Sequence, residues 1–121
     1  MPLKNVLLQH LRNNTHFVKK KNNIVHLYNE SAYTFKPHTC ITIGFNAVVV
    51  TSLPAVCVLI CNDLIHKLGL AYNINIMHTN DNYLHVTLYN YSNKTITLSQ
   101  GQLYVTGYIT MPGKPYFHFS V

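Results

Sequence analysis

The feature that most constrains the fold is the alternation of residue types in the second half of the chain. Between Tyr83 and Asn90, and again between Leu103 and Thr110, every second residue is Leu, Val, Ile or Gly. A period of two is the pattern of a β-strand with one face in a core and the other toward solvent or a partner. A shorter run of the same kind, 95–98, lies between them, and polar turns separate all three. This order predicts an all-β domain.

The middle of the chain extends this prediction. Short runs rich in Val, Ile, Thr and aromatic residues predict strands over 24–28, 33–36, 39–50, 55–61 and 70–77. Gly44 is expected to mark a bulge, and the nearly continuous apolar run 55–61 is expected to be buried on both faces. Residues 64–68 suit one helical turn or a loop, and 116–121 suit a last extended segment. Such spacing is typical of a β-barrel or sandwich.

The first residues differ from this pattern. We interpret 1–23 as an N-terminal arm and 24–121 as the β domain. Apolar residues between positions 6 and 11 could form one face of a short helix, so the arm is expected to be partly helical or extended. A single basic run follows, Lys19, Lys20 and Lys21, which is either a solvated patch or a weak contact for phosphate or nuclear import. An arm of this kind is expected to be ordered by a neighbouring chain.

Composition narrows the classes of partner. Of 121 residues, 48% are hydrophobic, which is enough for one core, but only 10% are charged, against about a quarter in typical domains. Uncharged polar and aromatic residues replace them and favour subunit contacts, so we expect a homo-oligomer. The net charge of +6 would attract nucleic acid, acidic proteins or anionic lipid. However, tyrosine stacking on nucleic acid needs interleaved cations, and 83–108 contains only Lys94, which argues against nucleic acid.

Cysteine and histidine usage indicates no cofactor. Cys40, Cys57 and Cys61 each lie in an apolar run and are expected to be small buried residues in a reducing compartment. Cys57 and Cys61 would share one face of a strand, but a zinc site would need histidine partners at ligand spacing, which the sequence lacks. No secretory signal and no apolar run long enough for a membrane span is evident. We therefore expect no metal, no cofactor and no membrane span.

Four segments, in order, resemble the dUTPase family over residues 35 to 110. They are Phe35–His38, Val49–Pro54, Val58–Asp63 and Val86–Ser92, the last followed by Gly101. The resemblance implies a dUTPase-like distorted β-barrel of the jelly-roll type, assembled as a homotrimer, with a site that hydrolyses a nucleotide beside these segments.

The residues that carry the family's chemistry are different here. Where the family has arginine-serine-glycine to hold phosphates, this chain has Cys61, Asn62 and Asp63. In the loop that supplies the water-activating aspartate, the sole carboxylate is Asp81. After Gly101 come Gln102 and Leu103, with Thr106 at the position of a glutamine, where the family has aspartate and arginine. A phosphoanhydride hydrolase needs a metal, cations on the phosphates and a base. We therefore predict that the chain is not an enzyme and has no catalytic residues.

A narrower resemblance covers the whole chain. Asn62-Asp63 after a strand, the segment Leu88–Ser92, Gly101 and a short hydrophobic C-terminus are similar to the catalytically inactive dUTPase-like early-region-4 proteins of adenoviruses. This implies a viral early protein that acts in the host cytoplasm or nucleus by protein–protein interaction, with a host signalling or scaffold protein as partner.

The C-terminal residues Phe119, Ser120 and Val121 are the candidate partner-binding site. Those adenovirus proteins bind PDZ domains, which add the ligand as a strand and take its last side chain into a pocket. Val121 suits such a pocket, and Phe119 matches the ligand class with hydrophobic residues at both positions. The alternative is a packed last strand.

Two other functions remain open. A structural or capsid-associated viral protein would dock by its N-terminal arm on a neighbour. A nucleotide-binding or active dUTP pyrophosphatase would retain the chemistry implied by the fold.

Overall fold

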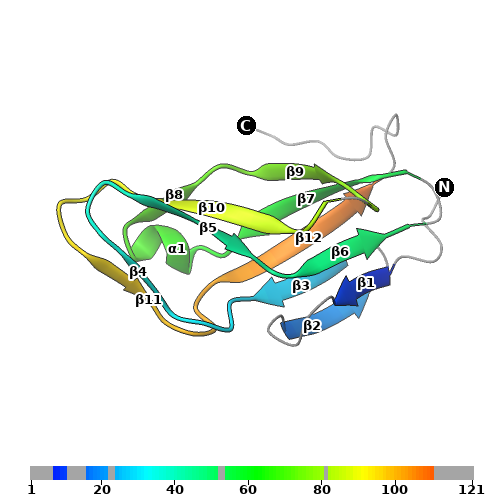
Figure 1. Ribbon diagram of the computed structural model, residues 1–121, viewed down its shortest axis with the longest axis horizontal. Coiled ribbons are helices and arrows are strands. Elements are labelled where there is room, and N and C mark those ends of the chain that lie inside the picture. The colour runs from blue at the N-terminus through cyan, green and yellow to red at the C-terminus, as the bar shows by residue number, and fades with distance from the viewer. Residues whose placement is uncertain (1–6, 11–15, 22–23, 52–53, 81, 111–121) are drawn as a thin grey trace.

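A computed structural model describes residues 7–10, 16–21, 24–51, 54–80 and 82–110, with the backbone alone described for the first two ranges. Its elements are β1 (Leu7–His10), β2 (His16–Lys21), β3 (Ile24–Tyr28), β4 (Tyr33–Phe35), β5 (Cys40–Gly44), β6 (Ala47–Val50), β7 (Val56–Cys61), α1 (Leu64–Lys67), β8 (Leu70–Tyr72), β9 (Asn75–His78), β10 (His85–Asn90), β11 (Ile96–Leu98) and β12 (Tyr104–Thr110). The prediction of an all-β fold is confirmed (Figure 1).

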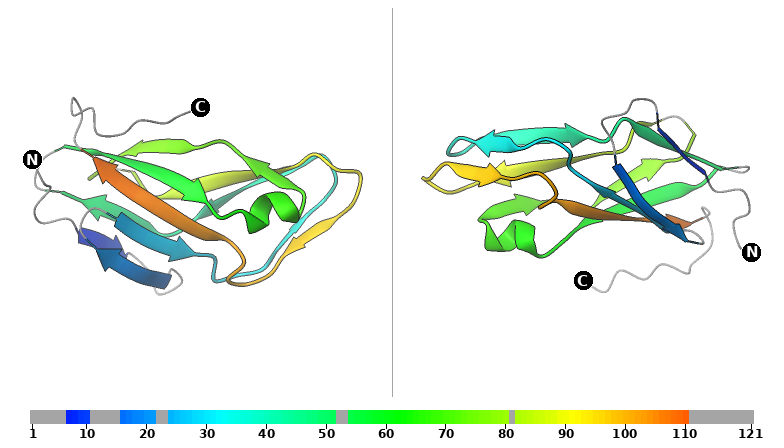
Figure 2. Two further views of the ribbon diagram at one scale, coloured as in Figure 1. Left: turned by 180° about the vertical axis from the view of Figure 1, so that it is seen from behind. Right: turned by 90° about the horizontal axis from the view of Figure 1, so that it is seen from below.

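The strands form four antiparallel sheets. The largest has the order β2-β3-β12-β7-β9, and the next has the order β5-β10-β8. Two short pairs, β1-β6 and β11-β4, complete the described part of the fold. The further views in Figure 2 show that β12 and β7 run side by side for most of their length. Apart from the hairpin of β2 and β3, strands that pair are not consecutive in the sequence, so this topology depends on long-range pairing.

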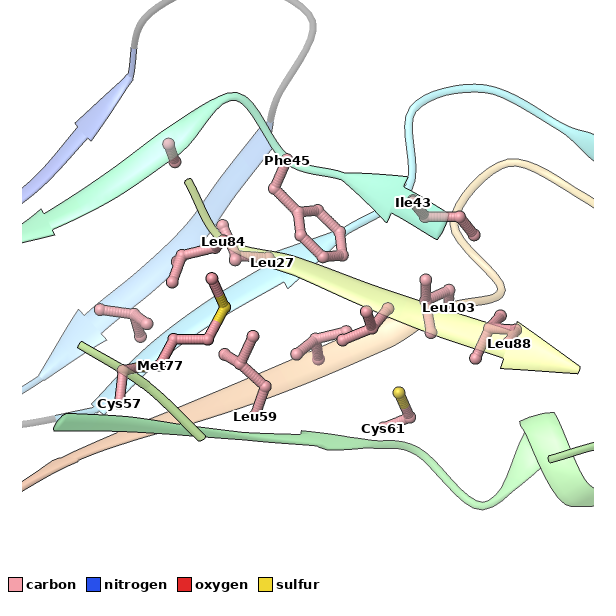
Figure 3. Packing of buried hydrophobic residues seen from close by; sticks show 14 of the residues in the cluster. Leu27, Ile43, Phe45, Cys57, Leu59, Cys61, Met77, Leu84, Leu88 and Leu103 are labelled. Carbon is pink, nitrogen blue, oxygen red and sulfur yellow. The ribbon is translucent and has the colours of Figure 1, made fainter. Parts of the chain in front are cut away.

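The core lies between the five-stranded and three-stranded sheets. Side chains of β5 and β10, such as Ile43 and Leu88, face side chains of β3 and β7, such as Leu27 and Leu59 (Figure 3). All four are at most 1% exposed. The sequence predicts that every second residue of β10 and β12 is buried. The burial pattern of both strands confirms this prediction residue by residue.

One glycine shows how tightly the five-stranded sheet packs against the core. A methyl group at Gly107 in β12 would lie 2.8 Å from Val25 Cγ2, 3.0 Å from Cys57 Sγ and 3.2 Å from Leu59 Cδ2. Carbon atoms do not approach that closely in a packed interior. The absence of a side chain at this position therefore lets neighbouring strands fill the space.

The structure decides three local predictions, two of which were wrong. Of the two conformations left open for the N-terminal arm, Leu7–His10 has the extended one and not the helix, because these residues pair with β6. Gly44 does not form a bulge: it pairs with His85, and the chain bends after it at Asn46, which has a φ of 52°. Cys40 is exposed rather than buried.

The strand expected over 70–77 is two strands. β8 pairs with β10 in the three-stranded sheet, whereas β9 pairs with β7 in the five-stranded sheet. The chain changes sheets at Asn73 and Ile74, which belong to neither strand. The helical turn expected over 64–68 is confirmed as α1. Burial of β7 is confirmed in part, because Val56 and Ile60 on its outer side are partly exposed.

The described part of the N-terminal segment adds strands to the sheets. β1 pairs with β6, and β2 pairs with β3 at the edge of the five-stranded sheet. The division of the chain at residue 23 stays a prediction. In the described ranges, no helix has the length and apolar character needed to cross a membrane.

Candidate interaction surfaces

The end of β7 is the position where the dUTPase resemblance places phosphate-holding residues. Cys61 is buried there, at 6% exposure. The side chain of Asn62 donates from Nδ2 to the carbonyl of Gln102 (2.9 Å) and accepts at Oδ1 from the backbone N–H of Tyr104 (3.0 Å). Both ends of the amide are thus used to join the end of β7 to the start of β12.

The turn before β12, which follows the glycine of the resemblance, is also bound into the fold. Gly101 has a φ of +80° and donates its N–H to the carbonyl of Asn29 (3.0 Å). Gln102 accepts at Oε1 from the N–H of Ser99 (2.6 Å). Asn29 is 2% exposed, and its Oδ1 accepts from the N–H of Leu103 (3.0 Å). These polar side chains are hydrogen-bonded within the fold and hold the turn.

The loop between β9 and β10 is where the resemblance places the water-activating residue. Asn80 has a φ of 76°; its Oδ1 accepts from the N–H of Thr51 (2.8 Å), and its N–H donates to the carbonyl of Val49 (2.7 Å). Thr79 is buried, and its hydroxyl lies 2.9 Å from that of Thr51. Asp81 lies outside the described residues.

The first surface candidate, which we name the five-stranded face, is the outward side of β3, β12, β7 and β9. Its residues are Ile24, His26, Tyr28, Val56, Val58, Ile60, Ile76, His78, Tyr104, Thr106, Tyr108 and Thr110. None of these carries a formal charge at neutral pH with histidine neutral. Three of these twelve residues are tyrosine, which is enriched at protein interfaces, and the lack of charged side chains matches the depletion of charge at interface centres.

Cross-strand contacts order this face. Tyr108 pairs with Ile24 on one side and with Val58 on the other. The rings of His26 and Tyr104 lie 5.4 Å apart. At the edge strand β9, the side chain of Ile76 is 60% exposed. We therefore treat this edge as part of a candidate contact surface.

The second candidate, which we name the three-stranded face, is the outward side of β5, β10 and β8. Its residues are Cys40, Thr42, Gly44, Ala71, His85, Thr87 and Tyr89. The hydroxyls of Thr42 and Thr87 lie 2.8 Å apart across the strands. Small hydroxyl-bearing residues in cross-strand pairs are compatible with a hydrated sheet surface.

Two hollows flank Tyr89 on this face. One lies where the chain changes sheets and is lined by Asn73, Ile74, Asn75, His85, Thr87 and Tyr89. Within this lining, Asn75 donates from Nδ2 to the carbonyl of His85 (2.9 Å). The other is lined by His38, Thr39, Cys40, Tyr89, Asn90 and Tyr91. Neither hollow could be predicted from the sequence, because each is lined by residues from separate segments.

Two sites read from the sequence lie largely beyond what the structure describes. Phe119, Ser120 and Val121 fall outside the described residues. For Lys19, Lys20 and Lys21 only the backbone is described, in β2, where they lie opposite His26, Val25 and Ile24. Both sites therefore stay predictions.

The two buried thiols are expected to be unreactive at neutral pH. Burial raises the pKa of Cys57 and of Cys61 to about 12, so both remain protonated at neutral pH. Burial also raises the pKa of Tyr72, whose hydroxyl donates to the carbonyl of Cys61 (3.2 Å). Among the residues that the structure describes, no group of three or more His, Cys, Asp or Glu is placed to hold a metal ion.

Comparison with known proteins gives a likeness of fold. No family model and no curated protein matches the sequence. Among solved structures, a point mutant of the dUTPase from phage phi11 of S. aureus matches with a TM-score of 0.75 at 9% identity, covering 97% of each chain. A mutant dUTPase of Staphylococcus bacteriophage 80alpha with dUpNHpp matches with a TM-score of 0.71 at 11% identity, covering 95% of this chain and 87% of that one. The EIAV dUTPase matches with a TM-score of 0.66 at 13% identity, covering 95% and 96%. The chain therefore has the dUTPase fold.

Proposed function

We propose that this chain is a non-enzymatic protein of the dUTPase fold that acts by binding other proteins, with host signalling or scaffold proteins as the partner class. One observation carries the proposal. At the end of β7 and in the turn before β12, where the family resemblance places nucleotide chemistry, Asn62 and Gln102 are hydrogen-bonded into the fold. Cys61 and Leu103 beside them are buried.

The chemistry of phosphoanhydride hydrolysis supports the same proposal. The transition state needs cationic groups or a metal on the phosphates and a base on the attacking water. Cys61, Asn62, Leu103 and Thr106 offer none of these. A neutral amide already engaged at both ends cannot replace the charge of an arginine.

The outward chemistry of the sheets supports protein binding. We assign the five-stranded face to contact between copies of the chain, three in number as the family resemblance implies. Burying Ile60, Ile76 and Tyr108 in such a contact would remove apolar area from water without desolvating a formal charge. The three-stranded face then remains available to a partner.

The source and location are part of the proposal. Two of the similar structures are phage dUTPases, and the narrower sequence resemblance is to the inactive early-region-4 proteins of adenoviruses. We propose a virus-encoded protein of that kind, acting in the host cytoplasm or nucleus. A PDZ domain is a candidate partner through Phe119, Ser120 and Val121. Deleting Val121 should abolish binding to a panel of purified PDZ domains, and unchanged binding would exclude this route.

Calorimetry with the non-hydrolysable analogue dUpNHpp and Mg²⁺ tests the absence of nucleotide chemistry. We expect no binding heat and, in a parallel assay, no pyrophosphate release from dUTP. An active dUTPase measured alongside serves as the positive control. Tight binding with turnover would overturn the proposal in favour of an enzyme.

Nucleotide binding without hydrolysis is the second candidate function. The observation in its favour is the hollow lined by Asn73, Asn75, His85 and Thr87, since a few convergent polar groups in a hollow are the usual form of a small-molecule site. In that case dUpNHpp should bind without turnover of dUTP, and Asn75→Ala should weaken it. Binding unaffected by Asn75→Ala would place the nucleotide elsewhere.

A further inference from the structure

Two loops that are far apart in sequence meet at one end of the molecule. They join β4 to β5 and β10 to β11, and both lie at the left in Figure 1. A single asparagine holds them together. Asn90 is 1% exposed, and its Nδ2 donates toward the carbonyls of Phe35 (3.1 Å), Lys36 (3.2 Å) and Lys94 (2.8 Å). The backbones of Lys36 and Lys94 are therefore fixed beside each other.

Further hydrogen bonds make this end rigid. The Oδ1 of Asn90 accepts from the backbone N–H (2.9 Å) and the hydroxyl (2.7 Å) of Ser92. The same hydroxyl lies 3.0 Å from the carbonyl of Lys94, so its one proton is shared between two acceptors, and its oxygen accepts from the N–H of Lys94 (3.2 Å). In the facing loop, Nε2 of His38 lies 2.7 Å from Oδ1 of Asn93. A ligand here would find a surface that is already ordered, which lowers the entropy cost of binding.

An aromatic platform lies beside the two lysines. The rings of Tyr89 and Tyr91 are stacked, with centroids 5.8 Å apart and planes inclined by 10°. Tyr91 is 69% exposed. The hollow that both rings line, together with His38 and Cys40, has a volume of about 260 Å³. Sites for drug-sized ligands occupy about 300–1,000 Å³, so this one suits a single planar ring.

The two loops joined by Asn90 each carry one lysine. Lys36 and Lys94 are both exposed, and within the described ranges neither ammonium group contacts a carboxylate. We name Lys36, His38, Tyr91, Asn93 and Lys94 the basic end. An exposed ring on loops that also carry two lysines is complementary to a base and its flanking phosphates.

We propose that the basic end binds single-stranded nucleic acid, with one base on Tyr91 and neighbouring phosphates on Lys36 and Lys94. This goes beyond the proposed protein-binding function. It reverses the expectation drawn from the sequence, which counted only Lys94 among the tyrosines. The fold supplies the second cation, Lys36, from the opposite loop. An acidic peptide would satisfy the lysines but would leave the ring without a flat partner.

Fluorescence anisotropy with a labelled oligothymidylate of about ten nucleotides tests the proposal on the full chain. Two phosphate contacts predict a slope of about −1.4 in log K against log salt, since each contact on a single strand contributes about −0.7. Tyr91→Ala should weaken binding by about tenfold. Lys36→Gln and Lys94→Gln should each reduce the slope by about 0.7.

Matched variants elsewhere on the chain control for general effects. Tyr83 is 58% exposed but lies before β10, and Lys67 lies in α1. Tyr83→Ala and Lys67→Gln should leave both affinity and slope unchanged. Far-UV circular dichroism of every variant checks that the fold is retained.

Three outcomes would overturn the proposal. The first is no binding at 50 mM salt. The second is binding that disappears in the triple variant Lys19→Gln, Lys20→Gln, Lys21→Gln but survives in Lys36→Gln and Tyr91→Ala, which would place the contact in the arm. The third is equal affinity for duplex DNA, or equal displacement by polyglutamate at the same charge concentration, because neither of these ligands offers a free base.

Discussion

The two larger sheets have the same inward chemistry and different outward chemistry. On their inner sides both present aliphatic residues that meet in one core, as Figure 3 shows. Outward, the five-stranded face carries Ile, Val and Tyr together with His and Thr, whereas the three-stranded face carries Thr, His, Tyr, Cys, Ala and Gly, has no Ile or Val, and leads to the basic end. Packing constrains only the inward residues. From the outward residues we therefore propose that the first face contacts an apolar surface of another copy and that the second contacts water or a polar ligand.

Placing a charge on each face in turn should give the largest difference between the two faces. Ile60→Lys places an ammonium group on the five-stranded face and should convert the proposed trimer to a monomer, because a charge buried without a partner costs several kcal/mol. Sedimentation velocity measures the change. Thr42→Lys on the three-stranded face is the control and should remain trimeric. Dissociation by Thr42→Lys alone would exchange the roles of the two faces.

The asparagines at the strand ends should differ in importance between the sheets. Asn90→Ala, at the end of β10, removes the amide that donates toward three backbone carbonyls and the oxygen that accepts from the N–H of Ser92, and should lower the free energy of unfolding by about 3 kcal/mol or more. Asn62→Ala, after β7, frees one carbonyl and one N–H and should cost about 1–2 kcal/mol. Urea denaturation followed by circular dichroism measures both. Equal losses of unfolding free energy in the two variants would contradict the expected difference between these asparagines.

Two glycines test how tightly each sheet packs. Gly107→Ala in the five-stranded sheet forces a methyl group against Val25 and Cys57 and should destabilise the protein by about 1–3 kcal/mol. Gly44→Ala in the three-stranded sheet meets nothing within 4 Å and should stay within about 0.5 kcal/mol of the parent. Thermal denaturation of the pair gives the comparison. A neutral Gly107→Ala would mean that the core can expand there.

The thiols on the inner side of β7 should make stability fall at high pH. In the unfolded chain Cys57 has the ordinary thiol pKa of 9.0, but burial raises its folded pKa to about 12, as it does for Cys61. Between these values the unfolded state has lost a proton that the folded state retains, so rising pH favours unfolding. The contribution is complete below pH 9 and falls by about 1.4 kcal/mol per pH unit for each thiol above it. Replacing both residues by alanine should flatten the urea midpoint between pH 9 and 10.5, and an unchanged pH dependence would assign it to other groups.

Thiol labelling compares the two sheets with the smallest perturbation, because it requires no substitution in the core. Iodoacetamide at pH 8 should modify Cys40, which is exposed on the three-stranded face, and should spare Cys57 and Cys61 in the core. In denaturant all three should react. Intact mass spectrometry counts the modifications, and labelling of a core thiol under native conditions would indicate local opening of β7.

Much of the fold could be read from the residues. The alternation in β10 and β12 leaves few choices, because shifting a strand by one residue would expose its whole apolar side. The segments that were misread lack such a constraint. Leu7–His10 has enough apolar residues for a helix or a strand, and only pairing with β6 decides between them. The break at Asn73 and Ile74 arises because β8 and β9 find different partners.

The sequence by itself determined that this chain is all-β, which side of each principal strand is buried, and that the residues near Cys61 and after Gly101 depart from those of a dUTPase. These properties depend on local periodicity and on residue identity. Only the tertiary structure decided that Asn62 and Gln102 are bonded into the fold and that Lys36 lies beside Lys94 and Tyr91. Such proximity is set by long-range strand pairing and by the amide of Asn90, whose hydrogen bonds to distant carbonyls leave no pattern along the chain.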